Sequence, residues 1–169
     1  MCGYSFLRIL GGSSLTDFTM EVPLGEKLLE AKKKERETPL TWVPCRNLLL
    51  LAHASAYAEV IQADAIFVGF NAEESRSYPD NDKEFVDTFN AMLSKAVAYF
   101  SKTPIVKAPL VDFLKKDIIA KGIEVKAPLN LTYPCYFGRD KHCGVFESCL
   151  RRRRGFKEAG VEDPTEYEY

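Results

Sequence analysis

The sequence has no long apolar run and almost no net charge. The apolar stretches are short, such as residues 48–52, far below the roughly 18 that span a bilayer. Lys and Arg number 23 against 24 Asp and Glu, so a formal charge of −1 disfavours broad electrostatic capture of nucleic acid. The N-terminus also lacks the features of a signal peptide. We expect a cytoplasmic domain with no membrane partner and no direct nucleic-acid partner.

Cysteine is also scarce, and its odd number of 5 argues against a disulfide framework. Three of the thiols, Cys135, Cys143 and Cys149, nevertheless fall within one short segment. Thiolates this close usually share a metal, and tetrahedral Zn²⁺ suits them best. The position where a fourth cysteine would be expected holds Phe146. His142, a water molecule or a residue from elsewhere could complete the site.

Short apolar runs alternate with helical spacings in the middle of the chain. Residues 65–69 and 105–108 are typical of parallel strands that lie inside a sheet. Apolar residues recur at helical spacing over 85–100, and a further helix is expected to open at Asp112. Asn47 could cap a helix whose apolar residues lie on nearly every face, so we expect that helix to be largely buried.

This alternation predicts an α/β fold with a parallel sheet. A chain of 169 residues fits a single domain. We divide it into an irregular N-terminal segment (1–40), an α/β core (41–125) and a Cys-rich segment with a C-terminal helix (126–169).

A candidate ligand site follows the first predicted strand, because ligands of parallel α/β sheets bind beyond the carboxyl ends of the strands. The loop there carries Asn71, Glu73, Tyr78 and Asp80, which can contact a nucleotide or a heterocycle. Arg46 begins the preceding helix and offers a guanidinium for phosphate or carboxylate. The alternatives are an ordinary solvated loop, and an Arg46 that pairs with a nearby acid.

The four consecutive arginines at 151–154 suggest a nucleic-acid patch at first sight. On a helix such residues point around the axis rather than along one face, and the acidic residues of the C-terminal tail lie close in sequence. Local charge compensation is therefore the preferred interpretation.

These segments together resemble a known family, the 7-cyano-7-deazaguanine (preQ0) synthases of the PP-loop adenine-nucleotide alpha-hydrolase superfamily. The resemblance covers residues 10–169 and is specific because many motifs recur in order. The matching stretches are GGSSLTD at 11–17 with EVP at 21–23, TWVPCRN at 41–47, AYAE at 56–59, ADAIFVGFN at 63–71, YPD at 78–80 with EF at 84–85, KAPL at 107–110, the whole of 131–149, RGFKEAG at 154–160 and DPT at 163–165.

The resemblance implies an ATP-dependent ligase that converts 7-carboxy-7-deazaguanine and ammonia to preQ0 for queuosine or archaeosine biosynthesis. It implies ATP, Mg²⁺ and a structural zinc held by four cysteines, of which Cys135, Cys143 and Cys149 match three. It also implies a homodimer and a Rossmann-like, three-layer parallel sheet with a C-terminal zinc clip.

Two departures from the family pattern qualify this expectation. The 169 residues contain no Ser-Gly-Gly-x-Asp-Ser phosphate loop, so we expect an N-terminally truncated or split form that is inactive on its own. The alternative is a non-catalytic binding or assembly module that needs a second chain for that loop. Phe146 replaces the fourth cysteine and is expected to weaken zinc binding severely.

Overall fold

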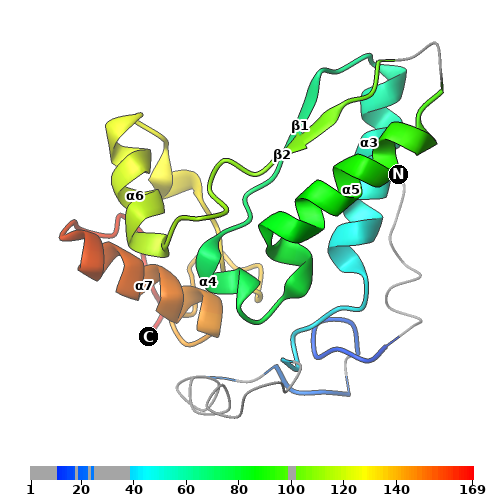
Figure 1. The fold of residues 1–169 in the computed structure, drawn as a ribbon. Coiled ribbons are helices and arrows are strands. Elements are labelled where there is room, and N and C mark those ends of the chain that lie inside the picture. The colour runs from blue at the N-terminus through cyan, green and yellow to red at the C-terminus, as the bar shows by residue number, and fades with distance from the viewer. Residues whose placement is uncertain (1–10, 18, 23, 25–38, 99–101) are drawn as a thin grey trace. The chain divides into compact units, whose positions relative to one another are not determined.

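The structure is a computed structural model that describes residues 11–17, 19–22, 24, 39–98 and 102–169 (Figure 1). The chain forms two compact units. One is continuous, Pro44–Phe113, and the other combines Leu114–Tyr169 with the segment up to Val43. Within the described residues, no helix has both the length and the apolar character of a membrane span.

The continuous unit is a mixed α/β structure, as predicted. Its two strands are parallel, and Ala65 pairs with Ile105 in the register. The elements in chain order are α3 (Arg46–Val60), β1 (Ala65–Phe67), α4 (Ala72–Ser75), the 3₁₀ turn η1 (Pro79–Asn81), α5 (Lys83–Ala96) and β2 (Ile105–Lys107). Within the described part of the chain the sheet consists of these two strands, and its membership in a three-layer sheet stays a prediction.

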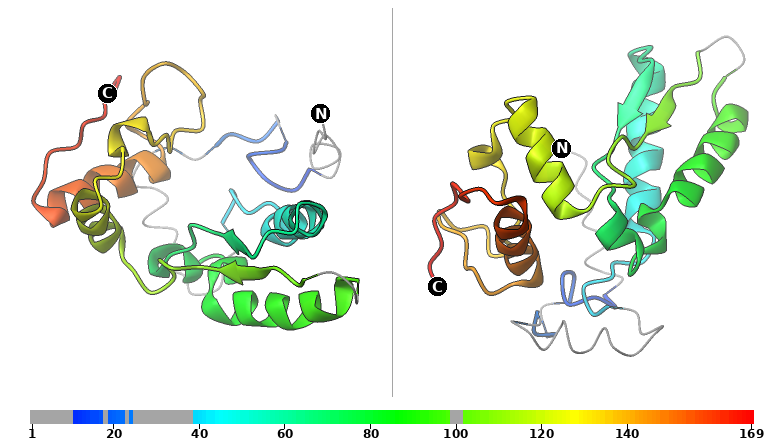
Figure 2. Two further views of the ribbon diagram at one scale, coloured as in Figure 1. Left: turned by 90° about the horizontal axis from the view of Figure 1, so that it is seen from above. Right: turned by 60° about the vertical axis from the view of Figure 1, so that its left-hand side comes forward.

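Helix α5 closes the outer edge of β2 through one side chain. The Asn90 amide donates to the carbonyl oxygen of Val106 at 2.9 Å, and its oxygen accepts the N–H of Val106 at 2.8 Å. A side-chain amide thus takes the place of a neighbouring strand, which satisfies backbone groups that an edge leaves unpaired. Figure 2 shows α5 alongside β2.

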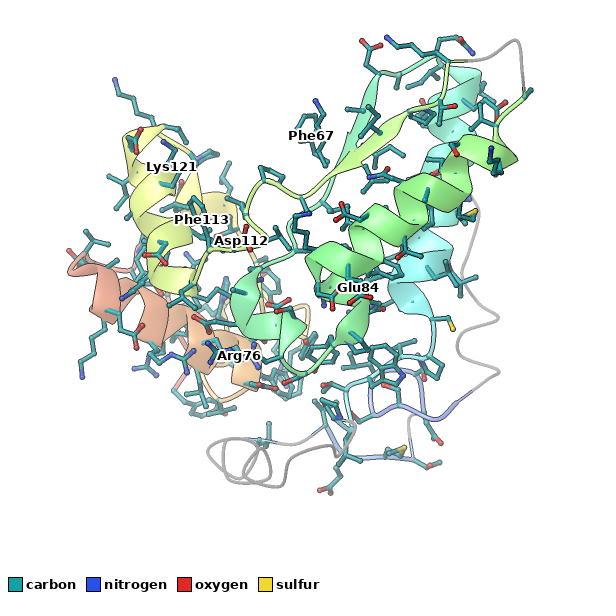
Figure 3. All side chains as sticks on the ribbon, in the orientation of Figure 1. Phe67, Arg76, Glu84, Asp112, Phe113 and Lys121 are labelled. Atoms are coloured by element: carbon teal, nitrogen blue, oxygen red, sulfur yellow. The ribbon has the colours of Figure 1, made fainter. Side chains whose placement is uncertain are left out.

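The core of this unit lies between the sheet and the helices. Leu51 of α3 packs with Val86, Phe89 and Leu93 of α5 and with Val106 of β2. The predicted helical spacing of 85–100 is confirmed up to Ala96, while Phe100 lies outside the described residues. By contrast, Phe67 extends away from α3 and α5 and is 69% exposed (Figure 3).

Two expectations for α3 are wrong. Its buried residues form one stripe, and Val60 on another face is 80% exposed, because the described structure covers only one side of the helix. Cys45 occupies the N-cap position with a left-handed φ of 53° and no capping side chain, so Asn47 does not cap the helix. The Asn47 side chain instead reaches η1.

The second unit contains α6 (Lys115–Glu124), the 3₁₀ turn η2 (Leu129–Leu131) and α7 (Glu147–Ala159). Helix α6 begins at Lys115, three residues later than expected. Leu114 is its N-cap residue, and the N–H of Leu114 donates to the carboxylate of Asp117. Asp117, and not Asp112, therefore supplies the carboxylate at the start of this helix. The two helices approach closely at Gly155, where an added Cβ would lie 2.9 Å from Cδ1 of Ile119.

Candidate functional site

Hydrogen bonds to backbone groups hold the polar loop after β1 in place. Asn71 is buried at the N-cap of α4, where its Oδ1 accepts the N–H of Glu74 at 3.2 Å. The N–H of Ala72 donates to the carbonyl oxygen of Phe113, the residue that follows the loop after β2. The predicted ligand residue Asn71 therefore fixes the path of the chain beyond the carboxyl end of β1.

A second predicted residue, Asp80, lies against the N-terminus of α3. The N–H of Asn47 donates to Oδ2 of Asp80 at 3.4 Å, and the Asn47 amide donates to the carbonyl oxygen of Asp80 at 3.1 Å. The same amide lies 3.3 Å from Oδ1 of Asn81. This places a carboxylate at the positive end of a helix that lacks a side-chain cap of its own.

Burial is the largest influence on Asp80 and raises the pKa of its carboxyl group. Hydrogen bonds from Asn47 and the positive charge of Arg46 act in the opposite direction but do not cancel it, so the pKa stays above its ordinary value. A buried carboxyl group with a perturbed pKa is typical of binding and catalytic sites. Asp80 thus contacts Asn47, the residue that follows Arg46 at the start of α3.

Glu73 and Tyr78 are partly exposed neighbours in the same unit. Glu73 lies in the first turn of α4, and the N–H of Tyr78 donates to the carbonyl oxygen of Glu74 at 2.9 Å just before η1. Helix α4 packs against η1, so the polar residues of the loop share one region of the unit. The residue that our site prediction omitted is Asn47, whose only signal was a polar side chain at the start of an apolar helix.

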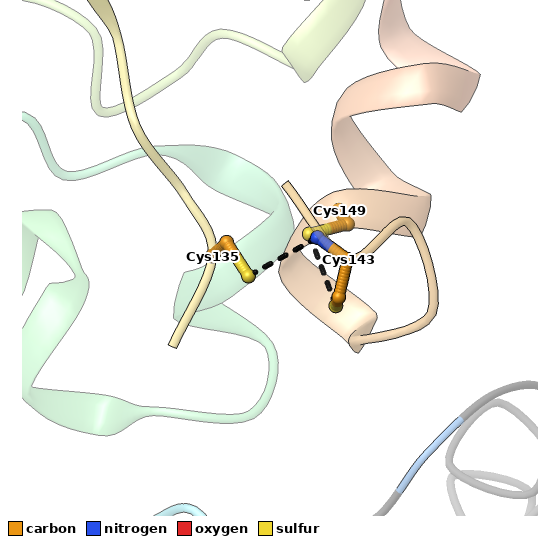
Figure 4. Close-up of side chains that lie close together, drawn as sticks. All are labelled: Cys135, Cys143 and Cys149. Carbon is orange, nitrogen blue, oxygen red and sulfur yellow. Dashed lines mark hydrogen bonds between the residues drawn. The ribbon is translucent and has the colours of Figure 1, made fainter. Parts of the chain in front are cut away.

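The three clustered thiols meet in the second unit (Figure 4). The sulfur atoms of Cys135, Cys143 and Cys149 all lie within 4.8 Å of one another, and all three residues are buried. Cys149 belongs to the first turn of α7, and Cys143 precedes a turn in which Gly144 has a φ of 79°. Three sulfurs this close could hold a metal ion.

Backbone N–H groups point at these sulfurs. Cys135 Sγ accepts the N–H of Cys143 at 3.4 Å, and Cys143 Sγ accepts the N–H of Val145 at 3.4 Å. Burial raises the pKa of Cys135, but hydrogen bonds from Cys143, Phe137 and Tyr133 outweigh burial and lower it overall. Burial, together with the charges of the neighbouring sulfurs, raises the pKa of Cys149 to about 12.

Phe146 occupies the space beside these sulfurs. It is 1% exposed, and its ring lies 4.5 Å from that of Phe137 and 5.5 Å from that of Tyr136, centroid to centroid. Among the described residues, the potential metal ligands gathered here are the three sulfurs alone. The described residues therefore supply three of the four ligands that a structural Zn²⁺ site takes.

His142, the possible fourth ligand, is buried between aromatic rings. Its ring centroid lies 4.4 Å from that of Tyr133 and 5.8 Å from that of Tyr167. Its Nδ1 has no hydrogen-bond partner among the described residues. Burial lowers the pKa of the imidazole, and the charge of Arg152 adds to this effect. The structure does not gather this nitrogen with the sulfurs.

Three of the four arginines at 151–154 pair with acidic residues, in line with the preferred interpretation of local charge compensation. Arg151 pairs with Glu147, and Arg154 pairs with Glu158. The remaining two arginines reach the C-terminal tail. Arg152 Nε lies 3.1 Å from Oδ1 of Asp163, and the Arg153 guanidinium lies 5.0 Å from the ring centroid of Tyr167.

Comparison with known proteins identifies the relatives of this chain. A family described as "Queuosine biosynthesis protein QueC" matches residues 1–160. The 7-cyano-7-deazaguanine synthase of Methanothrix thermoacetophila is 56% identical over 157 residues, which cover 93% of this chain and 69% of that protein. The synthase of Methanosphaera stadtmanae is 45% identical over 165 residues, 96% of this chain and 71% of its own length. The synthase of Acetivibrio thermocellus is 41% identical over 164 residues, which cover 94% of this chain and 69% of that protein. The resemblance inferred from the sequence is confirmed, and the chain belongs to the queuosine biosynthesis protein QueC family.

Proposed function

We propose that this chain acts in 7-cyano-7-deazaguanine synthesis as an ATP-dependent carbon–nitrogen ligase, with 7-carboxy-7-deazaguanine and ammonia as substrates. The observation that carries the proposal is the 56% identity to a named synthase across 93% of this chain. The product would be preQ0, the precursor for queuosine or archaeosine.

The chemistry requires activation of a carboxylate, which is a poor electrophile. Transfer of AMP from ATP to the substrate carboxylate creates a good leaving group and releases pyrophosphate. Ammonia then displaces AMP to give the amide, and further use of ATP allows loss of water to give the nitrile. Mg²⁺ bound with ATP would supply positive charge for the phosphates.

The polar loop of the continuous unit supports a role in holding these substrates. Arg46 provides a cationic fork for a carboxylate or phosphate. The N1–H and 2-amino groups of a deazaguanine form a donor edge, which carboxylates such as those of Glu73 and Asp80 complement. Asn71 and Tyr78 would contribute further polar contacts. In this scheme Asn47 is a positioning residue, because its hydrogen bonds hold Asp80 in place.

Further expectations rest on the family resemblance and remain proposals. These are a homodimer, a cytoplasmic location and the three-layer sheet. A direct nucleic-acid contact is not part of the proposal, since the arginines at 151–154 already have partners within the unit. Zinc is not used in the proposed chemistry, because its four-ligand requirement is not met by the described residues.

A synthesis assay tests the proposal. The 169-residue polypeptide is mixed with ATP, Mg²⁺, ammonium and 7-carboxy-7-deazaguanine, alone and with a second polypeptide that carries the family's Ser-Gly-Gly-x-Asp-Ser loop. Mass spectrometry follows the nitrile and AMP. We expect nitrile in the second reaction, dependent on this chain and reduced by Arg46→Gln. Absence of nitrile from both reactions would overturn the proposal.

A further inference from the structure

We propose that Cys135, Cys143 and Cys149 form a dry, three-coordinate thiolate site for a soft monovalent cation of the Cu(I) class, with Phe146 in the place of a fourth ligand. This inference goes beyond the proposed ligase function and departs from the zinc that the family resemblance implies. It rests on the geometry of the sulfurs and on the residues that surround them.

The three sulfurs are already arranged to share one cation. All lie within 4.8 Å of one another, and the sulfurs of Cys143 and Cys149 are 3.9 Å apart. The three side chains come from different parts of the segment and converge on one point (Figure 4). Because the surrounding loop and α7 hold them there, a cation would need little rearrangement of the ligands.

Burial disfavours negative charge on Cys149, and the groups around the sulfurs offset part of that cost. Backbone N–H groups of Cys143 and Val145 donate to two of them, and Cys149 lies in the first turn of α7, where the helix dipole favours anions. When Cu(I) binds, the three thiols release three protons to solvent. The resulting cluster carries two negative charges, which these N–H groups and the helix N-terminus stabilise.

Among the residues that the structure describes, none besides the three cysteines brings a donor atom to the cluster. Cys143 and Cys149 are 0% exposed and Cys135 is 6% exposed, so the site leaves little open surface through which water could reach a cation. The ring of Phe146 lies on the cluster and is itself held by Phe137, centroid to centroid at 4.5 Å. Zn²⁺ in structural sites takes four ligands, whereas three thiolates satisfy a soft cation such as Cu(I).

The test compares three forms of the reduced, metal-free full chain. Wild type, Phe146→Cys and Phe146→Leu are each titrated with Zn²⁺ and with Cu(I) against chromophoric chelators. Phe146→Cys restores a fourth thiolate and should raise the Zn²⁺ affinity by about a hundred-fold, while the Cu(I) affinity changes by less than about ten-fold. Phe146→Leu is the matched control. It removes the ring without adding a donor and should keep the wild-type ratio of affinities.

X-ray absorption of the Cu(I)-loaded wild type gives a readout that needs no variant to fold. We expect three sulfur neighbours and no nitrogen or oxygen neighbour. The proposal is overturned if a light-atom ligand is present, if Cu(I) does not bind, or if wild type binds Zn²⁺ as tightly as Phe146→Cys does. None of these readouts depends on synthase activity, so failure here leaves the proposed function standing.

Discussion

The Nε atom of Arg152 lies 3.1 Å from Oδ1 of Asp163, and this pair fastens the C-terminal tail to α7. The other Asp163 oxygen accepts the hydroxyl proton of Tyr167 at 2.6 Å. Arg152 also donates to the carbonyl oxygen of Leu129 at 3.0 Å, so one guanidinium joins α7, η2 and the tail. Tyr167 also forms a backbone β-bridge with His142, which lies next to Cys143. The Arg152–Asp163 pair therefore supports the segment that carries the thiols.

Replacing Asp163 by Asn should lower the free energy of unfolding by about 3 kcal/mol, since the buried Arg152 charge loses its partner. The side chains of the two residues are only 10% and 13% exposed. The control is Glu158→Gln, which breaks an ion pair to Arg154 that is 43% and 45% exposed and should cost less than about 1 kcal/mol. Urea unfolding measures both. Equal losses of unfolding free energy in the two variants would contradict the conclusion that the Arg152–Asp163 pair stabilises the packing of the tail on α7.

The same pair predicts a dependence of stability on pH. Burial raises the pKa of Asp163, but the hydrogen bond from Tyr167, the charge of Arg152 and the contacts with Thr165 outweigh it, so the folded pKa lies below the ordinary 3.8. The stabilisation is therefore full above pH 3.8 and is lost as pH falls through the lower, folded value. The difference in unfolding free energy between wild type and Asp163→Asn should therefore shrink as the pH falls below 3.8. A difference that stays constant between pH 6 and pH 3 would be inconsistent with this assignment.

Gly144 should not tolerate alanine. Its φ is 79°, and an added Cβ would lie 2.4 Å from the carbonyl oxygen of Tyr169. Gly138 is the matched control, because its φ of 64° carries the same backbone strain while the space around it is open. We expect Gly144→Ala to cost about 2 kcal/mol or more and Gly138→Ala about 1 kcal/mol in thermal or urea unfolding. Similar costs would mean that the tail does not pack against Gly144.

Asn90 should matter to the sheet more than its place on a helix suggests. Asn90→Ala removes both hydrogen bonds to Val106 and should cost about 1–3 kcal/mol, with faster hydrogen exchange of the Val106 amide. Asn90→Asp keeps an acceptor for that amide and should preserve more of its protection. Ser94→Ala, which removes an exposed hydroxyl of the same helix, is the control and should leave the exchange unchanged.

The spacing of apolar residues along the sequence predicted the helices and strands that bury one face. The spacing of Phe85, Phe89 and Leu93 indicated the face of α5 that packs in the core, and the short apolar runs indicated two parallel strands. The gathering of three thiols was also foreseeable, because they lie close in sequence. Such features depend on local spacing, which the sequence displays directly.

Features that depend on distant partners could not be predicted in this way. Asn47 was interpreted as a helix cap, yet its partners Asp80 and Asn81 lie more than 30 positions away. Asn90 replaces a strand at the edge of β2, a role that nothing in a helical pattern signals. The exposure of Val60 depends on what covers α3 rather than on the composition of the helix.

The most direct test of the central claim is calorimetric titration of the chain with 7-carboxy-7-deazaguanine. We predict saturable, one-to-one binding that Arg46→Gln weakens by about ten-fold or more, because a charged hydrogen bond is lost. A thermal unfolding scan ensures that the variant is folded. No saturable binding by the wild type, or unchanged affinity in folded Arg46→Gln, would contradict the account.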